Sequence, residues 1–318
     1  MHKLPYFVIA ALMLLVGCAK DAPIDEEEPI VDERFVEGTV EMGMYSHGVD
    51  LGFFIENLDF SRDDVREQFA ELAENNEEAQ RFMELIESYS QRNPFLGLAV
   101  MMNGVVCTYH IKGDAVLGKA RGLGFIFDNY HNASENRGQL YLQTLTQDES
   151  IPEADRAISV QYTPSEDLAP GNNLELEMYL RQVATQRKVV AGYECQVTTY
   201  TLRPEHIVAP DPENSVPVSP RPYKVVAYTS AAFSPTINFT HPFYLEEEHG
   251  ILQLEIYFEN ADEPTLVMTP DRIMPRALAN SEMEIDETQP LYDLNDLQVG
   301  WKMLAIMMSG WGALGDTE

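Results

Sequence analysis

The chain has 318 residues, of which 52 are acidic and 21 are basic, so its formal net charge is −31 at pH 7. This acidic excess excludes the nucleic-acid-binding classes, because such proteins neutralise phosphates with Lys and Arg. An apolar content of 45% is ordinary for a globular protein, and the length allows a sizeable hydrophobic core.

Residues 1–17 have the layout of a secretory signal peptide, with Lys3 as the only formally charged side chain. The apolar run over 7–16 is shorter than the ~20 residues that a membrane-spanning helix needs. Leu15-Val16-Gly17-Cys18 resembles the lipobox of bacterial lipoproteins, which implies that Cys18 carries acyl chains such as palmitate and becomes the first mature residue. The alternatives are an ordinary secretory signal and an uncleaved anchor. The resemblance places the protein in the bacterial cell envelope, at the outer membrane, with the periplasmic or surface face left open.

Residues 18–34 form an acidic, proline-containing segment that we interpret as an extended, solvated tether. Its acidic residues are Asp21, Asp25, Glu26, Glu27, Glu28, Asp32 and Glu33. Because this charge disfavours docking on anionic lipids, membrane attachment depends on Cys18. Lys20-Asp21 is similar to export signals that carry some lipoproteins to the outer surface.

The segment from Phe35 to about Phe60 alternates between apolar and polar residues, which predicts a half-buried strand. Residues 61–92 then show helical spacing, with Ser61 as the predicted N-cap and Asp64 in the third helical position. The apolar positions predict one amphipathic helix, or two helices broken near Asn75-Asn76, ending before Pro94.

After Pro94 the pattern is almost entirely that of β-structure. Tight turns are predicted at 103–104, 112–114, 136–138 and 249–250. The expected strands are 96–102, 105–112, 115–118, 123–128, 139–144, 157–163, 174–180, 185–191, 193–203, 223–230, 251–259 and 264–269. Short antiparallel strands beside a helical region predict a mostly β fold of the α+β class, a curved sheet or open barrel packed on helices. We expect one domain over 35–300.

Two segments depart from this pattern. Residues 203–222 contain six prolines and predict a stiff surface loop. Residues 301–318 form an apolar tail, which is expected either to be a short helix closing the core or to be an exposed patch for a partner or a lipid.

Two motifs carry a resemblance to a known family. One is a strand that ends in the turn Lys112-Gly113-Asp114, and the other is the Ala-Gly-Tyr-x-Cys strand over 191–195. In this order, followed by strands at 223–228 and 250–256, they resemble a GLPGLI-type envelope domain related to the LolA/LolB lipoprotein carriers. The resemblance implies a LolA-like half-barrel, a curved antiparallel sheet wrapped over helices, here with a helical insert at 61–92.

The residues of these motifs have a structural interpretation. Gly113 suits a turn with positive φ, and Gly192 suits a bulge or a close approach at the start of a strand. Tyr193 and Cys195 are two residues apart, so their side chains point to the same face of the sheet. Because Cys107 and Cys195 both lie in strand-like runs, they form either a disulfide or two buried free thiols.

No motif in the sequence predicts a catalytic centre or a cofactor. The phosphate-binding loop, the Gly-x-Ser-x-Gly elbow and the His-Glu-x-x-His helix are missing from the sequence. Two loose polar clusters are weak metal candidates: His241 and His249 around Glu246-Glu247-Glu248, and Asp128 with His131 and Asn132.

These features predict a non-enzymatic, lipid-anchored envelope protein whose β domain binds an apolar ligand, such as an acyl chain, or a protein partner of the envelope. The first alternative is a structural or assembly subunit of a surface complex, with the 203–222 loop and the tail as contacts. A hydrolase is the remote alternative.

Overall fold

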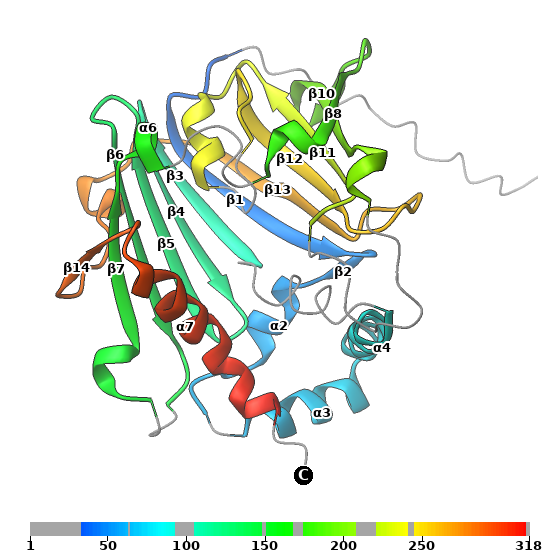
Figure 1. The fold of residues 1–318 in the computed structure, drawn as a ribbon, viewed down its shortest axis with the longest axis vertical. Helices are drawn as coiled ribbons and strands as arrows, with labels where there is room; N and C mark the ends of the chain where they lie inside the picture. The colour runs from blue at the N-terminus through cyan, green and yellow to red at the C-terminus, as the bar shows by residue number, and fades with distance from the viewer. Residues whose placement is uncertain are drawn as a thin grey trace, which may run out of the picture.

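The structure is a computed structural model that describes residues 33–62, 64–92, 105–147, 151–167, 174–207, 221–240 and 245–315. It is dominated by one sheet of 14 strands (Figure 1). The order across the sheet is β14-β7-β6-β5-β4-β3-β1-β13-β12-β11-β10-β8, with β2 added on β1 and β9 added on β10. In the described part of the chain every pairing is antiparallel except that of β14 with β7.

The bounds of the elements are as follows. The strands are β1 (Glu37–Ser46), β2 (Val49–Asp50), β3 (Val106–Lys112), β4 (Ala115–Gly122), β5 (Phe125–Asn132), β6 (Arg137–Thr144), β7 (Ala157–Tyr162), β8 (Tyr179–Val183), β9 (Lys188–Val190), β10 (Tyr193–Leu202), β11 (Lys224–Ser230), β12 (Gly250–Tyr257), β13 (Leu266–Pro275) and β14 (Leu291–Asp293). The helices are α2 (Gly52–Asn57), α3 (Val65–Asn75), α4 (Glu77–Arg92), α6 (Pro164–Asp167) and α7 (Leu297–Gly315), with short 3₁₀ turns between elements.

The chain builds this sheet from its centre outwards. β1 lies in the middle, and β3 to β7 then form a meander on one side of it. The chain next starts the other side at its far edge, with β8, and returns through β10, β11 and β12 to β13, which pairs with β1. Residues 276–290, which we call the strap, then cross back to the first side, where β14 pairs with β7 (Figure 1).

The expectation of a LolA-like half-barrel is wrong. The observed fold is a large 14-stranded sheet made of two meanders on either side of β1, with a parallel pair at one edge. The two motifs behind the resemblance lie in different meanders, at the β3–β4 turn and the β9–β10 turn. Motif order along the chain gives the order of strands in sequence, but it does not give their order in the sheet.

The first predicted strand is shorter than expected. β1 ends at Ser46, and α2 (Gly52–Asn57) occupies the region that the alternating pattern had assigned to a strand. Leu51, Phe54, Ile55 and Leu58 are all buried, and their spacing of three and four residues is helical. The helical period covers only two turns and directly follows the alternating strand, so the alternation masks it in the sequence.

Two helices, not one, follow. α3 ends at Asn75 and α4 begins at Glu77, so the break lies at Asn76, whose side-chain oxygen accepts the backbone N–H groups of Glu78 (2.8 Å) and Ala79 (3.0 Å). The predicted N-cap at Ser61 is wrong, because α3 begins only at Val65. The Ser61 hydroxyl instead donates to the Asp59 carboxylate at 2.6 Å.

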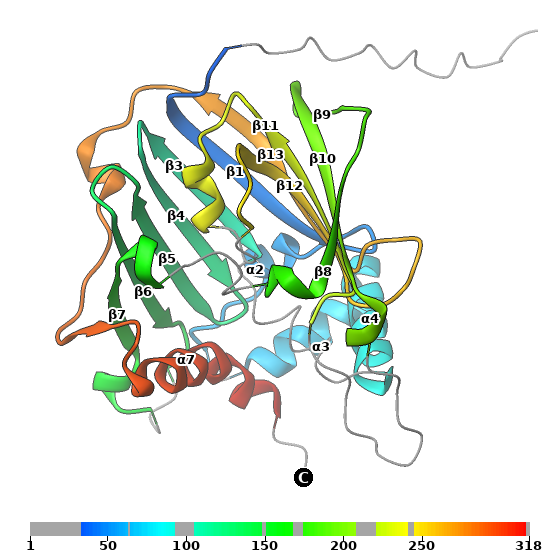
Figure 2. The same ribbon diagram turned by 45° about the horizontal axis from the view of Figure 1, so that its top comes forward.

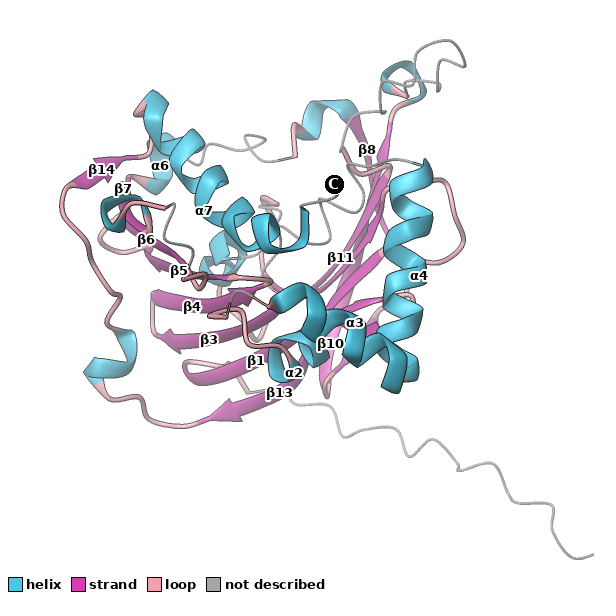
Figure 3. Ribbon diagram, turned by 90° about the horizontal axis from the view of Figure 1, so that it is seen from below, coloured by secondary structure: helices cyan, strands magenta, loops and turns pink. Residues whose placement is uncertain are grey.

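The helices lie on one face of the bent sheet, which we call the inner face (Figures 2 and 3). Three buried clusters fill it. The largest extends from the second meander across β1 to β3 and β4, and it includes Met42, Tyr109, Tyr200 and Leu254. The second joins α2, α3 and α4 to the centre of the sheet, and the third places α7 against β5, β6 and β7. The opposite face, crossed by the strap, is the outer face.

Residues 301–315 of the apolar tail belong to α7, which starts at Leu297. Val299 and Ile306 are buried against the sheet, whereas Trp301 is 76% exposed. The helix therefore packs on the core with one side and leaves a large aromatic ring in solvent on another. Within the described ranges, no helix combines the length and the apolar character needed to cross a membrane.

Candidate functional site

The predicted site residues are distributed over several places. Cys18, His241 and most of the proline-rich 203–222 loop lie outside the described residues. Cys107 on β3 and Cys195 on β10 are buried free thiols rather than a disulfide. Burial raises the pKa of each thiol to about 12, so neither is a nucleophile at neutral pH.

The described members of the two candidate metal clusters do not come together as a metal site. Asp128 and His131 are three residues apart on β5, so their side chains lie on opposite faces of the sheet. Glu247 is instead a buried carboxylate that accepts a 2.6 Å hydrogen bond from the Tyr200 hydroxyl and pairs with Arg181 at 3.2 Å. Among the described residues no group of three or more potential ligands could hold a metal ion.

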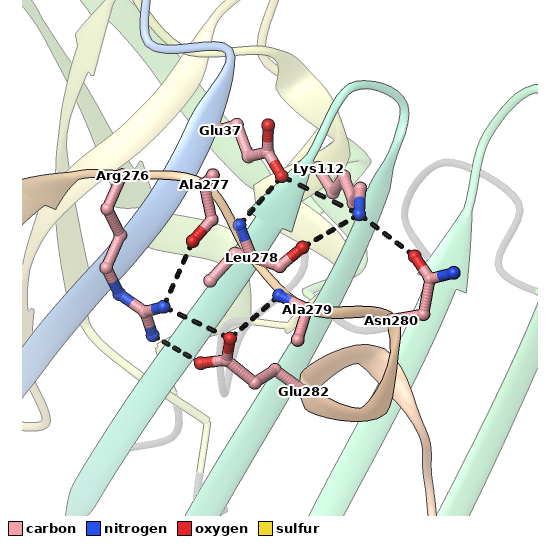
Figure 4. A network of polar contacts seen from close by, with 8 residues as sticks. All are labelled: Glu37, Lys112, Arg276, Ala277, Leu278, Ala279, Asn280 and Glu282. Atoms are coloured by element: carbon pink, nitrogen blue, oxygen red, sulfur yellow. Dashed lines mark hydrogen bonds and ion pairs between the residues drawn. The ribbon is translucent and has the colours of Figure 1, made fainter.

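The Lys-Gly-Asp turn anchors the strap (Figure 4). Gly113 has φ of 61°, a left-handed conformation that glycine adopts without strain. The Lys112 ammonium donates to the Leu278 carbonyl at 2.9 Å and to the Asn280 side chain at 3.1 Å. In the strap itself, a pair of bonds between Arg276 and Glu282 at 2.5 and 3.1 Å lowers the pKa of that carboxyl to about 2.

Beneath the strap, a straight row of polar residues crosses the outer face. Asp128 lies opposite Lys119 on one neighbouring strand and opposite Tyr141 on the other, and Tyr141 lies opposite Ser159. Residues opposed in this way have Cβ atoms about 5 Å apart. The Ser159 hydroxyl oxygen accepts the Thr288 N–H of the strap at 2.7 Å, so the strap closes over the end of the row.

Asp128 is the unusual member of the row. Asp128 is only 5% exposed, and this burial raises the pKa of its carboxyl to about 6. The positive charge of Lys119 opposes the rise, and the negative charge of Asp286 in the strap adds to it. On the inner face, His131 is 1% exposed and stacks on Phe239 with ring centroids 3.9 Å apart. Burial lowers the pKa of this imidazole to about 4, and neither ring nitrogen has a hydrogen-bond partner among the described residues.

A polar pocket of about 280 Å³ opens where β6 and β7 meet β14. It is lined by Arg137, Gln139, Gln161 and Asp293, among other residues. Such a lining suits polar groups and does not suit the acyl chain that the sequence led us to expect.

The edge of the sheet at β8 and β9 has a different character. Both strands pair with β10, and in the described part of the chain no strand pairs with their other side. Three apolar side chains stand in solvent here, with exposures of 48% for Leu180, 44% for Val183 and 49% for Val189. Natural sheets usually protect such edges with charged residues, bulges or short strands. β8 and β9 are short and carry Arg181 and Lys188, yet they leave these apolar side chains in solvent.

The ladder between β8 and β10 fixes which backbone groups face outwards. The Ala184 N–H donates to the Val197 carbonyl, and the Arg203 N–H donates to the Met178 carbonyl, both at 2.9 Å. Hydrogen-bonded positions alternate in an antiparallel pair, so the backbone groups of Arg181 and Val183 point away from β10. Among the described residues no strand pairs with these groups, so an added strand can bind them.

The edge is also the basic part of an acidic protein. Residues 178–193 contain Arg181, Arg187 and Lys188 and no acidic residue, in a chain of net charge −31. Arg187 pairs with Glu194 at 2.5 Å, whereas the structure gives Lys188 no ion pair among the described residues. The sequence alone shows this segregation of charge.

Comparison with known proteins adds little. No family model matches the chain, and no curated protein matches it. One partly similar solved structure is described as "Structure of PNGF-II in C2 space group"; the identity is 9%, the TM-score is 0.35, and the match covers 63% of this chain and 29% of that chain. The protein thus spans under a third of that chain, and a likeness of this size shows neither its fold nor its function.

Proposed function

We propose that the protein is a lipid-anchored, non-enzymatic binding protein of the bacterial cell envelope that docks an extended polypeptide on the β8–β9 edge. The single observation that carries the binding role is this edge, with outward backbone groups at Arg181 and Val183 and apolar side chains in solvent. A polypeptide added as a further strand would gain main-chain hydrogen bonds from the edge and selectivity from alternate side chains. The basic side chains favour an acidic partner.

The anchoring part of the proposal rests on the lipobox-like sequence at Cys18. Mass spectrometry of the N-terminal peptide of protein extracted from membranes should show Cys18 as the first residue, carrying acyl chains. A chain that retains residues 1–17, or an unmodified Cys18, would contradict the anchor and leave the binding edge untouched.

Replacing Val183 with proline is expected to weaken strand docking at least tenfold. Proline removes the outward N–H at this position while the bonds of its neighbours to β10 remain, so the sheet keeps its edge strand. The full chain would be purified in mild detergent, and binding of a labelled (Glu-Val)₅ peptide would be followed by fluorescence anisotropy, with (Lys-Val)₅ for comparison.

The matched control is Val183→Thr, which keeps the N–H and a β-branched side chain. It should retain binding within about threefold, which corresponds to less than 1 kcal/mol. Equal affinity of the proline and threonine variants, or tighter binding of the lysine peptide, would rule out β-strand addition at this edge. Uptake of a fluorescent fatty acid by the same protein would instead favour the apolar-ligand role.

A further inference from the structure

The β8–β9 edge lies beside the point where the acidic N-terminal segment enters the domain. The Phe35 N–H donates to the Ala232 carbonyl at 2.8 Å, and its ring stacks on Phe233 at 4.8 Å. Phe233 in turn meets the ring of Tyr193, the first residue of β10, at 5.0 Å. Burial raises the pKa of Tyr193, and the negative charge of Glu33 adds to the rise, so Glu33 lies near this side chain. The preceding residues therefore start from the β9 end of the edge.

We infer that the acidic segment 19–32 of this chain is itself an occupant of the β8–β9 edge, so that a partner must displace it. This inference rests on the proposed function, because it uses the same edge and the same outward backbone groups. It adds an intramolecular competitor and therefore regulation of the site.

The length of the segment fits the edge. An extended chain covers at most about 3.3 Å per residue, so residues 19–32 reach roughly 46 Å from Glu33. The edge from Val190 to Tyr179 covers twelve positions, about 40 Å at the rise of a strand. The segment can therefore run along both β9 and β8 without leaving the sheet.

The charges and side chains of the segment also match. The run Asp25-Glu26-Glu27-Glu28 lies five to eight residues before Glu33, which puts it within reach of Arg187 and Lys188. Lys188 has no ion pair among the described residues, and the one acid beside it, Glu194, is already paired with Arg187. Ile30 and Val31 offer apolar side chains to the exposed Val189. Pro29 is compatible with an added strand when its nitrogen faces away from β9.

The test compares the full chain with a variant in which four acids are neutralised, Asp25→Asn, Glu26→Gln, Glu27→Gln and Glu28→Gln. Hydrogen exchange is read at the outward amides of Arg181 and Val183. We expect exchange at both amides to be at least tenfold faster in the variant, and the affinity for the (Glu-Val)₅ peptide to rise at least fivefold. High salt should also speed exchange at both amides in the unmodified chain, because the attraction of the segment is electrostatic.

A matched control neutralises four exposed acids on the helices, Glu67→Gln, Glu71→Gln, Glu74→Gln and Glu84→Gln, and should change neither readout. Equal exchange and equal peptide affinity in the unmodified chain and the segment variant would overturn the inference. In that case the Val183 variants still decide whether the edge docks a strand. Conversely, slow exchange that depends on the segment, with no binding of any added peptide, would uphold the inference and remove the proposed partner role.

Discussion

Replacing Gly138 with alanine is expected to lower the free energy of unfolding by about 3 kcal/mol, at the upper end of the usual cost of overpacking. A β-carbon at this position would lie 2.0 Å from the Cζ atom of the Tyr162 ring. The ring cannot simply withdraw, because it is buried and its hydroxyl donates to the Asn129 side chain at 2.8 Å. Its displacement would also leave a buried polar pair unsatisfied.

A double-mutant cycle measures this clash directly. Tyr162→Leu removes the ring, and in that background Gly138→Ala should cost less than about 1 kcal/mol in urea unfolding. If the alanine costs the same in both backgrounds, the clash is not its cause, and lost backbone freedom at position 138 would have to account for it.

The second large effect concerns Asp128. Its carboxyl has a pKa of about 6 in the fold, above the unfolded value, so the folded state binds the extra proton between about pH 4 and 6. This group therefore makes the fold less stable as the pH rises through that window. Replacing Asp128 with asparagine is expected to raise the free energy of unfolding at pH 7 by about 2 kcal/mol, and by almost nothing at pH 4.

His131 works in the opposite direction over nearly the same range. Its pKa of about 4 in the fold lies below the unfolded value, so the unfolded chain binds the extra proton and stability falls as the pH drops from about 6.5 to 4. In the native chain the two contributions largely cancel. Relative to the native chain, the free energy of unfolding of Asp128→Asn should therefore fall by about 2 kcal/mol between pH 6.5 and pH 4. That of His131→Phe should rise by a similar amount.

These variants are compared by urea unfolding at pH 4, 5, 6 and 7. Phenylalanine keeps the stack on Phe239, so a change in slope with pH reports the lost proton site and not lost packing. In the double variant, the free energy of unfolding should depend on pH as weakly as it does in the native chain. Parallel curves for all four proteins would show that neither buried group titrates with the shifted pKa.

Local patterns in the sequence predicted local structure well. Many strands after residue 105 lie within a few residues of their expected positions, because alternation and Gly-containing turns act over short distances. The placement of β1 between two meanders was not predictable, since pairing of distant strands leaves no local signal. The strand β14 was also missed, because its three residues pair only after the strap has crossed the outer face.

For the candidate site, too, local features were predictable from the sequence and the arrangement of distant strands was not. The structural role assigned to Tyr193 and Cys195 agrees with their burial in the main cluster. The edge that now carries the proposal was predicted as two ordinary strands, at 174–180 and 185–191. The sequence of a single strand does not show whether that strand will lie at the edge of a sheet. The absence of acidic residues over 178–193 is, however, visible in the sequence.

The position of β1 also decides how the protein would respond to a mechanical load. Tension on the N-terminal segment enters the sheet at β1, which is hydrogen-bonded to β13 on one side and to β3 on the other along most of its length. Pulling this strand out along its own axis requires both ladders to shear together, whereas an edge strand is held by a single ladder. The domain is therefore built to stay folded when it is pulled from its N-terminus.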